Sequence, residues 1–279
     1  MSRKKITAVI IAKNEETMLP ACIKTLSWCD QLLLIDCASS DQTAAIAEKL
    51  GAQVIGFDHS SFAKIRDKAL EYVETDYLFY VDADERVTPA LAKEILVHLE
   101  NDDCQAMQIN RENICYGHRF HHGNWQNDQV LRVFQSKSLK GWQGEIHESP
   151  IFSGQICQLQ QKLIHLTHRS TQQNLFKSAN WTIKEASLLA KAEQTPRVTF
   201  ALIVRKGIME FYRRAIKHQG RKDGMAGLVE ALVQGINRML VYIQVWALQQ
   251  KPSLAERYLK EEQKIAQAWA SEGKSIKQS

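Results

Sequence analysis

Short apolar runs alternate with amphipathic stretches over the first hundred residues of the chain. Each run is rich in Ile, Val, Leu or aromatic residues and ends in a polar cluster, which is typical of strands buried on both faces. The predicted strands are 6–11, 31–35, 53–56, 77–81 and 106–110, and the predicted helices include 43–50, 62–73 and 88–99. Strands of this kind joined by helices predict a parallel α/β sheet.

The pattern changes after residue 111 and again after residue 170. Residues 112–170 are irregular and rich in Gly, His and Trp, with short strands predicted at 130–134 and 163–166. Beyond Asn174 the pattern is helical throughout. We therefore expect one α/β domain over residues 1–170, with two halves that meet near residue 111, followed by a helical region over residues 171–279.

Three polar clusters follow three of the predicted strands directly. They are residues 13–15, residues 36–41 and residues 82–85. Ligands bind outside the carboxyl ends of the strands in sheets of this class, so we expect the binding site at these clusters.

The cluster at 82–85 contains three carboxylates, from Asp82, Asp84 and Glu85. Carboxylates this close repel one another unless a cation or hydrogen-bond donors compensate them. A divalent ion that bridges to substrate phosphate is one solution, because Mg²⁺ is commonly held by one or two carboxylates and phosphate oxygens. The alternative is a solvated acidic turn that caps the helix near Pro89.

The cluster at 36–41 has a similar position one strand earlier. Asp36, Ser39 and Asp41 are candidates to accept hydrogen bonds from a ribose or a base. Ser40 or Asp41 is also expected to cap the helix that begins at Thr43, and the two roles are compatible.

The formal net charge of +5 is unevenly distributed. Residues 1–196 carry 21 Lys and Arg against 24 Asp and Glu, whereas residues 197–222 carry eight cations against Glu210 alone. A basic amphipathic helix is typical of a membrane-surface element, attracted to anionic lipid by about 1 kcal/mol per cation. Nucleic acid is disfavoured as a partner because no recognised nucleic-acid module accompanies this segment.

Residues 228–248 carry only two charged side chains, Glu230 and Arg238. Twenty-one residues are long enough to cross a bilayer. The two charges nevertheless disfavour a helix exposed to lipid on all sides. We expect a helix that packs against the domain, lies in the membrane interface or pairs with another subunit; the alternative is a cap wholly buried on the domain.

The six cysteines form no C-x-x-C pair and lie in apolar or strand-like contexts. This usage predicts free thiols in a reducing compartment. The N-terminal apolar run is about six residues long and is interrupted by Lys13, so a signal peptide is not expected. Both observations favour the cytoplasm.

Four motifs resemble family 2 glycosyltransferases, which have the GT-A fold. They are ITAVIIAKNEE, LLLIDCASSDQT, FAKIRDKALE and YLFYVDADERV, in this order over the first hundred residues. Two later segments, RVFQSKSLKGWQGEIHESP and LIHLTHRSTQQNLFKSANW, are similar to the branch that includes lipopolysaccharide-core β-1,4-glucosyltransferases. The resemblance implies a mostly parallel GT-A sheet flanked by helices over 1–170, with a nucleotide-sugar half to residue 111 and an acceptor half over 112–170.

The resemblance also implies roles for particular residues. Residues 12–15 (with Ala12, Asn14 and Glu15) and Asp36 would hold the uridine of a nucleotide sugar, and Arg66 would lie near the diphosphate or donor sugar. Asp82 and Asp84 form the Asp-x-Asp motif, in which Asp84 would bind a divalent Mg²⁺ or Mn²⁺ and Asp82 would lie nearer the ribose.

An inverting transfer needs a general base that takes the proton of the acceptor hydroxyl. Glu148 is our first candidate because the branch resemblance includes its His-Glu pair; Glu145 is second and Asp128 third. The chain lacks the Glu-Asp pair that many family members carry at the acceptor side. The alternative for Glu148 is a surface or salt-bridged residue.

Histidines are frequent between residues 118 and 168, and metal-ligand spacing is one interpretation. Loop histidines that bind the acceptor or face solvent are the other interpretation, which we favour. His165, at the end of the predicted strand 163–166, is the candidate for an additional metal or diphosphate contact.

The resulting hypothesis is an inverting glycosyltransferase, peripheral to the cytoplasmic face of the inner membrane. It would transfer a hexose, glucose from UDP-glucose, to a lipopolysaccharide-core or related glycolipid. One alternative is an enzyme of the same fold that acts on a polysaccharide or lipid-carrier acceptor. The other is a non-catalytic scaffold that binds nucleotide sugars, with the helices as a partner-binding module.

Overall fold

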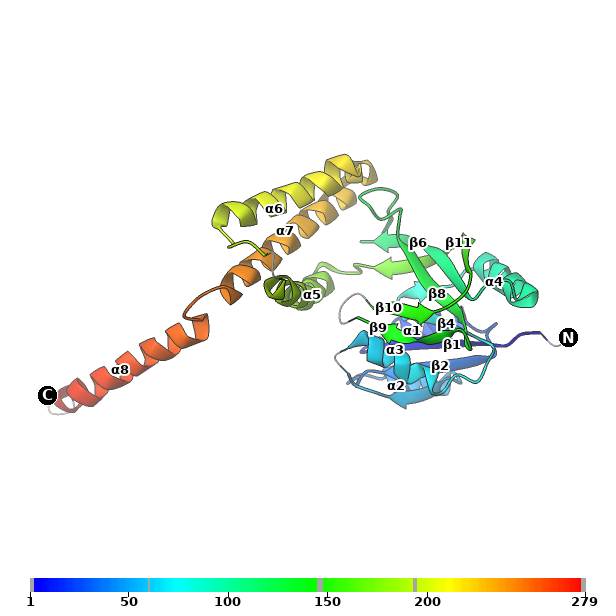
Figure 1. The fold of residues 1–279 in the computed structure, drawn as a ribbon, viewed down its shortest axis with the longest axis horizontal. Helices are drawn as coiled ribbons and strands as arrows, with labels where there is room; N and C mark the ends of the chain where they lie inside the picture. The colour runs from blue at the N-terminus through cyan, green and yellow to red at the C-terminus, as the bar shows by residue number, and fades with distance from the viewer. Residues whose placement is uncertain (1–2, 60, 145–147, 193–194, 277–279) are drawn as a thin grey trace. The chain divides into compact units, whose positions relative to one another are not determined.

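The computed structural model describes residues 3–59, 61–144, 148–192 and 195–276 (Figure 1). The chain forms two compact units. The first comprises residues 1–171 together with 218–227, and the second comprises 172–217 together with 228–279. Residues 218–227, which lie within the region expected to be helical, therefore belong with the α/β unit.

The first four strands form the parallel part of the sheet that the sequence predicts. They are β1 (Ile6–Ala12), β2 (Gln31–Asp36), β3 (Gln53–Gly56) and β4 (Tyr77–Asp82), in the spatial order β3-β2-β1-β4. The connections contain α1 (Leu19–Lys24), α2 (Thr43–Lys49) and α3 (Phe62–Leu70). Gly51 follows the end of α2 with φ +84°, a backbone conformation that favours glycine.

The remaining strands extend the same sheet with mixed directions. Beyond β4 the order is β8 (Gln129–Gln135), β6 (Ala106–Cys115), β11 (Ile156–Thr167) and β5 (Glu85–Arg86), and β7 (His118–Arg119) pairs with β6. The β4–β8 and β8–β6 pairs are antiparallel, whereas β6 and β11 are parallel. Because β8 lies between them, β6 runs in the same direction as β4, and the expectation of a mostly parallel sheet is confirmed. A second sheet pairs β9 (Leu139–Gln143) with β10 (Ser149–Phe152).

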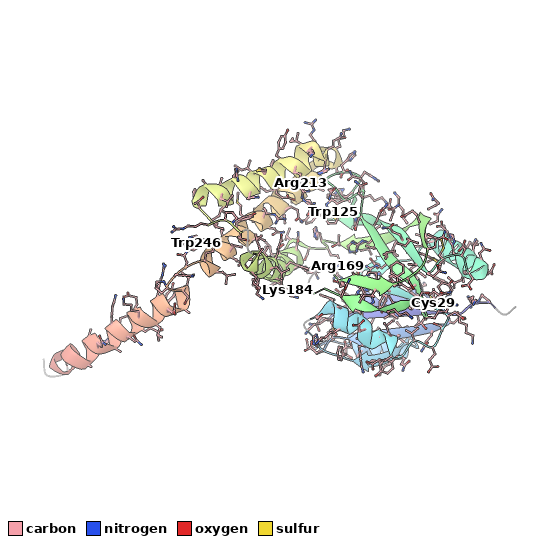
Figure 2. The ribbon with its side chains drawn as sticks, in the orientation of Figure 1. Cys29, Trp125, Arg169, Lys184, Arg213 and Trp246 are labelled. Carbon is pink, nitrogen blue, oxygen red and sulfur yellow. A yellow bond between two sulfur atoms is a disulfide. The ribbon has the colours of Figure 1, made fainter. Side chains whose placement is uncertain are left out.

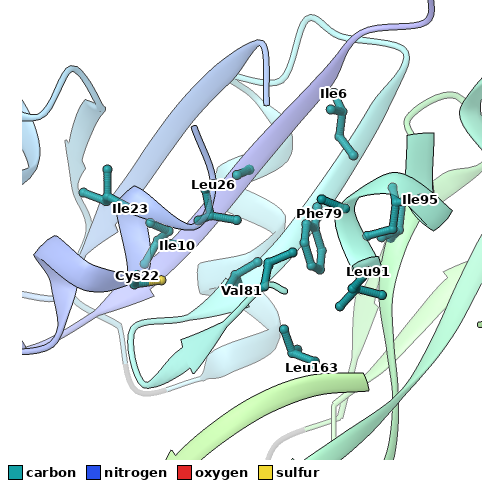
Figure 3. Close-up of a cluster of buried hydrophobic side chains, with 14 of the residues drawn as sticks. Ile6, Ile10, Cys22, Ile23, Leu26, Phe79, Val81, Leu91, Ile95 and Leu163 are labelled. Atoms are coloured by element: carbon teal, nitrogen blue, oxygen red, sulfur yellow. The ribbon is translucent and has the colours of Figure 1, made fainter. Parts of the chain in front are cut away.

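The strands bury alternate side chains on the two faces of the sheet. Ile10, Phe79, Val81 and their neighbours pack under α1 and under α4 (Pro89–Asn101), as Figure 3 shows. On the opposite face Leu33, Leu78 and others pack against α3 and β9. This burial of both faces explains why the strands appear in the sequence as continuous apolar runs.

Several predicted boundaries are wrong; β11, for example, begins at Ile156 and not at residue 163. β6 extends five residues beyond 110, because Arg111, Asn113 and their neighbours pair with adjacent strands although they are polar. Asp41 accepts the backbone N–H of Thr43 at 3.0 Å, but the residue that caps α2 is Gln42.

The expectation of six free thiols is also wrong. Cys104 and Cys157 form a disulfide with a Cα–Cα distance of 5.7 Å, whereas Cys22, Cys29, Cys37 and Cys115 are free. Cys104 lies just before β6 and Cys157 lies at the start of β11. Since these strands are neighbours in register, they bring together cysteines that are 53 residues apart.

The second unit consists of long helices. They are α5 (Thr171–Lys191), α6 (Phe200–Tyr212), α7 (Gly224–Leu248) and α8 (Leu254–Ile276). A small core of Ala186, Val198, Val241, Tyr242 and Val245 joins α5 and α7. None of the helices in the described part of the chain meets the length and hydropathy that a membrane span requires.

The basic segment 197–222 is not one continuous helix. After α6 it passes through a π-helical turn (Arg213–Lys217) and a 3-10 helix (Gly220–Asp223). Gln219 between them has φ 60°, which breaks the helical path. The break allows Asp223 to accept the backbone N–H of His122 at 2.9 Å.

Two substitutions on α4 test the packing. Ile95 is fully buried and Val97 is 54% exposed on the same helix. We expect Ile95→Ala to lower the free energy of unfolding by about 2–5 kcal/mol, because it removes a buried side chain and leaves a cavity. Val97→Ala should cost less than about 0.5 kcal/mol. Urea unfolding of both variants measures the difference, and equal losses would contradict the packing described here.

Candidate functional site

The parallel register brings the first three polar clusters to one edge of the sheet. Ala12 lies opposite Asp36, and the preceding residue, Ile11, lies opposite Asp82. These residues end β1, β2 and β4, so Ala12, Asp36 and Asp82 lie side by side as predicted from the strand ends.

The loop after β1 is locked to the loop after β2. The backbone N–H of Asn14 donates to Ser39 Oγ at 3.0 Å, and Asn14 Oδ1 accepts the backbone N–H of Ser40 at 2.7 Å. Asn14 and Ala38 both have φ 55°, so each loop turns sharply directly after its strand. The two loops therefore form one rigid rim.

Asp36 lies beneath this rim and is buried. Its Oδ2 accepts the backbone N–H of Ser39 at 3.1 Å. Its Oδ1 is buried and has no hydrogen-bond partner within the described residues. A buried carboxylate oxygen without a donor is costly, so this atom is suited to accept a hydrogen bond from a ligand.

Asp41 and Glu15 stabilise the rim through protein contacts. Asp41 accepts the hydroxyl of Thr43 at 2.5 Å and the backbone N–H of Glu16 at 3.1 Å. Burial alone would raise the pKa of Asp41, but these hydrogen bonds outweigh it and hold the pKa below its usual value. Glu15 is paired at 3.0 Å with Arg169, which follows β11 and is labelled in Figure 2.

Arg132 on β8 neutralises the acidic cluster that ends β4. Its guanidinium donates to Glu85 Oε1 at 2.7 Å and to Asp82 Oδ2. Both Arg132 and Glu85 are buried. The cluster is therefore an ion-pair network within the protein, and not a solvated turn.

The pKa values of the two carboxyl groups beside Arg132 are shifted in opposite directions. Burial would raise the pKa of Asp82, but Arg132, Arg66 and Arg111 together hold it well below its usual range. Burial and the nearby charge of Asp82 raise the pKa of Glu85 above its usual value. Asp82 is therefore the more strongly anionic member of the pair.

A second network begins at Arg111 and extends toward Asp84. Arg111 donates two hydrogen bonds to Asp128, at 2.8 and 2.9 Å, and a third to Glu85 at 3.3 Å. The side-chain amide of Asn113 donates to Asp128 at 2.9 Å. Burial would raise the pKa of Asp128, but Arg111 and Asn113 outweigh it and lower it. These contacts disfavour Asp128 as a general base.

His165 continues this network toward Asp84. Its Nδ1 lies 2.6 Å from Asn113 Oδ1, and because the amide nitrogen of Asn113 already donates to Asp128, Nδ1 is assigned as the donor. The other ring nitrogen, Nε2, lies 3.7 Å from Asp84 Oδ2. Metal-ligating histidines typically donate a hydrogen bond from the ring nitrogen that does not bind the metal, as Nδ1 of His165 does to Asn113.

Arg66 and Glu148 are brought together by the structure. Arg66 Nε donates to Glu148 Oε1 at 3.3 Å. The guanidinium of Arg66 lies over the rings of Tyr80 and Trp142, at 4.9 and 4.6 Å from their centroids. Glu148 is thus paired with Arg66, a contact that leaves its role as a base a prediction, and Glu145 lies outside the described residues.

The loop histidines have a different partner. His122 Nδ1 lies 2.8 Å from Asp223 Oδ1, and Asp223 also accepts the backbone N–H of His121. This contact ties the loop to residues 218–227 of the same unit. His121 and His122 therefore contribute to packing in the described structure.

Four residues of this site were not predicted from the sequence: Arg111, Asn113, Arg132 and Arg169. Arg132 is a single charged residue inside an apolar strand, VLRVF at 130–134, whereas Arg111 and Asn113 lie in the polar run NREN at 110–113. A lone charge in an apolar strand is a usable signal, because a buried charge requires a partner of opposite sign. Arg169 had no such signal, since it lies in a polar segment.

Comparisons with known proteins agree on one family. The family model described as glycosyl transferase family 2 matches residues 7–165. The lipopolysaccharide core biosynthesis glycosyltransferase LpsC of Rhizobium meliloti is 23% identical over 89% of this chain and 96% of its own length. An uncharacterized glycosyltransferase of Rickettsia conorii is 26% identical over 85% of this chain and 88% of its own length.

Solved structures are more distant. S. aureus TarS 1–349 is 12% identical over 88% of this chain and 90% of its own, with a TM-score of 0.46. Glucosyl-3-phosphoglycerate synthase from Mycobacterium tuberculosis, solved with Mn²⁺, UDP and phosphoglyceric acid, is 16% identical over 48% of this chain and 56% of its own, with a TM-score of 0.37.

Replacing Arg132 tests the charge balance at the sheet edge. Arg132→Met leaves two carboxylates without their cation, and we expect a loss of about 3–5 kcal/mol in the free energy of unfolding at pH 7. Without Arg132 the lowered pKa of Asp82 rises, and the pKa of Glu85, which already lies above its usual value, rises further. The folded variant therefore binds more protons than the unfolded chain, and its deficit should shrink as the pH falls from 7 to 5.

Urea unfolding at both pH values measures this effect. Arg132→Lys keeps the positive charge and is the matched control, with a smaller deficit expected at pH 7. A deficit in Arg132→Met that does not change with pH would contradict the network.

Proposed function

The chain belongs to the family 2 glycosyltransferases, and from this premise we propose that it transfers a hexose from a nucleotide sugar to a glycolipid with inversion. The donor we propose is UDP-glucose, and the acceptor is the lipopolysaccharide core or a related glycolipid. The observation that carries the assignment of a nucleotide sugar is the buried Oδ1 of Asp36. This oxygen accepts no hydrogen bond within the described residues.

The rim residues would bind the nucleoside. Asp36 Oδ1 would accept a hydrogen bond from the base or ribose, and Ala12 and Asn14 would form the wall of the same pocket. Ser39 and Asp41 fix the loop that presents Asp36, and Glu15 fixes it from the other side through Arg169. Asp82, the next strand end, would face the ribose.

The residues present fit a divalent cation. Asp84 supplies a carboxylate oxygen and His165 supplies Nε2, and the contact of Nδ1 with Asn113 orients the imidazole. Asp84 and His165 would hold Mg²⁺ or Mn²⁺, which would neutralise charge on the departing diphosphate. Arg66 would add a positive charge on the donor side.

Glu148 is the general base that we propose. Its carboxylate would take the proton from the acceptor hydroxyl as that oxygen attacks the anomeric carbon. The hydrogen bond from Arg66 to Oε1 holds the carboxylate in place. The residue proposed to contact the sugar donor, Arg66, is thus hydrogen-bonded to Glu148, the residue proposed to contact the acceptor hydroxyl.

The acceptor proposal rests on the relative from Rhizobium meliloti, whose similarity covers most of both chains. The helices of the second unit support an acceptor held at a membrane. On α6, Phe200, Ile208 and Tyr212 are exposed beside the cations Arg205 and Lys206. We propose that this face docks on the anionic cytoplasmic surface of the inner membrane. Pairing of these helices between two copies is the alternative, which sedimentation would detect.

Carboxylate variants separate binding from chemistry. We expect Asp36→Asn to weaken UDP binding about 10- to 100-fold, the value of a hydrogen bond to a charged group. Asp84→Asn should lower metal-dependent transfer at least about 100-fold, and Glu148→Gln should lower kcat about 100- to 10,000-fold while UDP binding stays intact.

Calorimetry with UDP and transfer of radiolabelled UDP-hexoses give the two readouts. Glu48→Gln, an exposed carboxylate on α2, is the control and should behave as wild type. UDP binding without turnover on any acceptor, with Glu148→Gln silent, would identify a non-catalytic scaffold instead.

Mass spectrometry of lipopolysaccharide from cells with and without this chain tests the acceptor. We expect the core to lack one hexose when the chain is missing. An unchanged core, together with transfer to a polysaccharide or lipid carrier in vitro, would replace our acceptor by one of those classes.

A further inference from the structure

A group of four potential metal ligands lies away from the site described above. His98, Asp103, Cys104 and Cys157 each offer one ligand atom, and these atoms all lie within 4.8 Å of one another. No role in binding the donor or the acceptor has been given to any of them. His98 lies on α4, Asp103 and Cys104 lie just before β6, and Cys157 lies at the start of β11. Asn113 and His165 lie near the other ends of these two strands.

The local fold of α4 creates three of the four positions. The helix ends at Asn101, and Asp102 adopts a left-handed conformation with φ 51°. Its backbone N–H donates to the carbonyl of His98 at 3.0 Å. This turn brings Asp103 and Cys104 back beside the His98 ring.

The distances between three of these ligand atoms fit a tetrahedrally coordinated ion. His98 Nδ1 lies 3.0 Å from Asp103 Oδ1 and 3.5 Å from Cys104 Sγ, and the last two atoms are 3.1 Å apart. Tetrahedral zinc with bonds of about 2.0–2.3 Å separates its ligand atoms by about 3.3–3.8 Å. These three atoms therefore already lie close to one face of such a tetrahedron.

Cys157 completes the set from the neighbouring strand. In the disulfide its Sγ is bonded to that of Cys104. After reduction the two sulfurs need to separate to about 3.8 Å, which rotation of the side chains achieves without moving either strand. Cys104 is buried, so its thiolate would be shielded from water, while Asp103 is exposed and gives the ion a route of entry.

We propose that the reduced chain binds one Zn²⁺ through Cys104, Cys157, His98 and Asp103, and that the disulfide is the metal-free state of this site. Two thiolates favour a soft cation such as Zn²⁺ over Mg²⁺. Four protein ligands leave no open position, so the ion is structural and joins α4 to β6 and β11. In either redox state a cross-link ties together the starts of the two strands that carry Asn113 and His165.

The conversion between the states is a two-electron oxidation by a peroxide. The two thiolates lose one electron each as the S–S bond forms, and the O–O bond of the peroxide breaks. Two protons convert the peroxide oxygens to two molecules of water when the oxidant is H₂O₂. Zn²⁺ leaves because the disulfide sulfurs are no longer thiolate ligands.

Zinc titration of the full chain tests the proposal. The protein is reduced under anaerobic conditions, freed of metal, and titrated with Zn²⁺ against a chromophoric chelator. All measurements use the Asp84→Asn background, which removes the other predicted metal site. We expect one Zn²⁺ per chain for the reduced protein and none for the disulfide form.

Variants and a spectroscopic probe identify the ligands. Cys157→Ser and His98→Asn should weaken binding at least about 100-fold, whereas Cys29→Ser, a cysteine outside the group, should bind as its parent does. Co²⁺ in place of Zn²⁺ should show thiolate-to-metal charge-transfer absorption that Cys157→Ser abolishes. Addition of H₂O₂ should release the bound zinc.

Three results would overturn the proposal. One is a reduced chain that binds no Zn²⁺, and another is binding that both ligand variants leave unchanged. The third is a Co²⁺ complex without thiolate absorption. If Cys157→Ser does not fold, as judged by circular dichroism, His98→Asn decides the outcome because this side chain is only partly buried.

Discussion

Arg132 is the cation on which the carboxyl edge of the sheet depends. It is buried between Asp82 and Glu85, and it reaches them because β8 runs antiparallel beside β4. Without a buried cation, two carboxylates at the end of an apolar strand would repel each other and lose their hydration. The antiparallel strand inserted into a mostly parallel sheet therefore makes the acidic motif compatible with a folded chain.

Asp84 has a different neighbour from these carboxylates. Asp82 and Glu85 are held by Arg132, and Asp128 is held by Arg111 and Asn113. Asp84 instead faces His165, whose other nitrogen is bound by Asn113. Two strands thus supply the arginines that neutralise the structural carboxylates. A third strand supplies the imidazole beside the carboxylate that we assign to the metal.

The first four strands and the strand-end residues were predictable from the sequence, because strands buried on both faces leave continuous apolar runs and polar clusters follow them. The pairing of Arg66 with Glu148 and of Cys104 with Cys157 was not predictable. Both join residues more than 50 positions apart in the sequence, which only the folded structure brings together. The length of β6 was underestimated because its polar residues have partners on adjacent strands, which a periodic pattern does not reveal.

The central claim is that Asp84 and His165 hold the cation beside a nucleotide bound at Asp36. Anomalous diffraction from crystals grown with Mn²⁺ and UDP tests it most directly. The account predicts a manganese peak about 2.0–2.3 Å from an Asp84 oxygen and from His165 Nε2, with the uridine in hydrogen-bond contact with Asp36 Oδ1. A manganese peak coordinated elsewhere, or uridine bound away from Asp36, would contradict it.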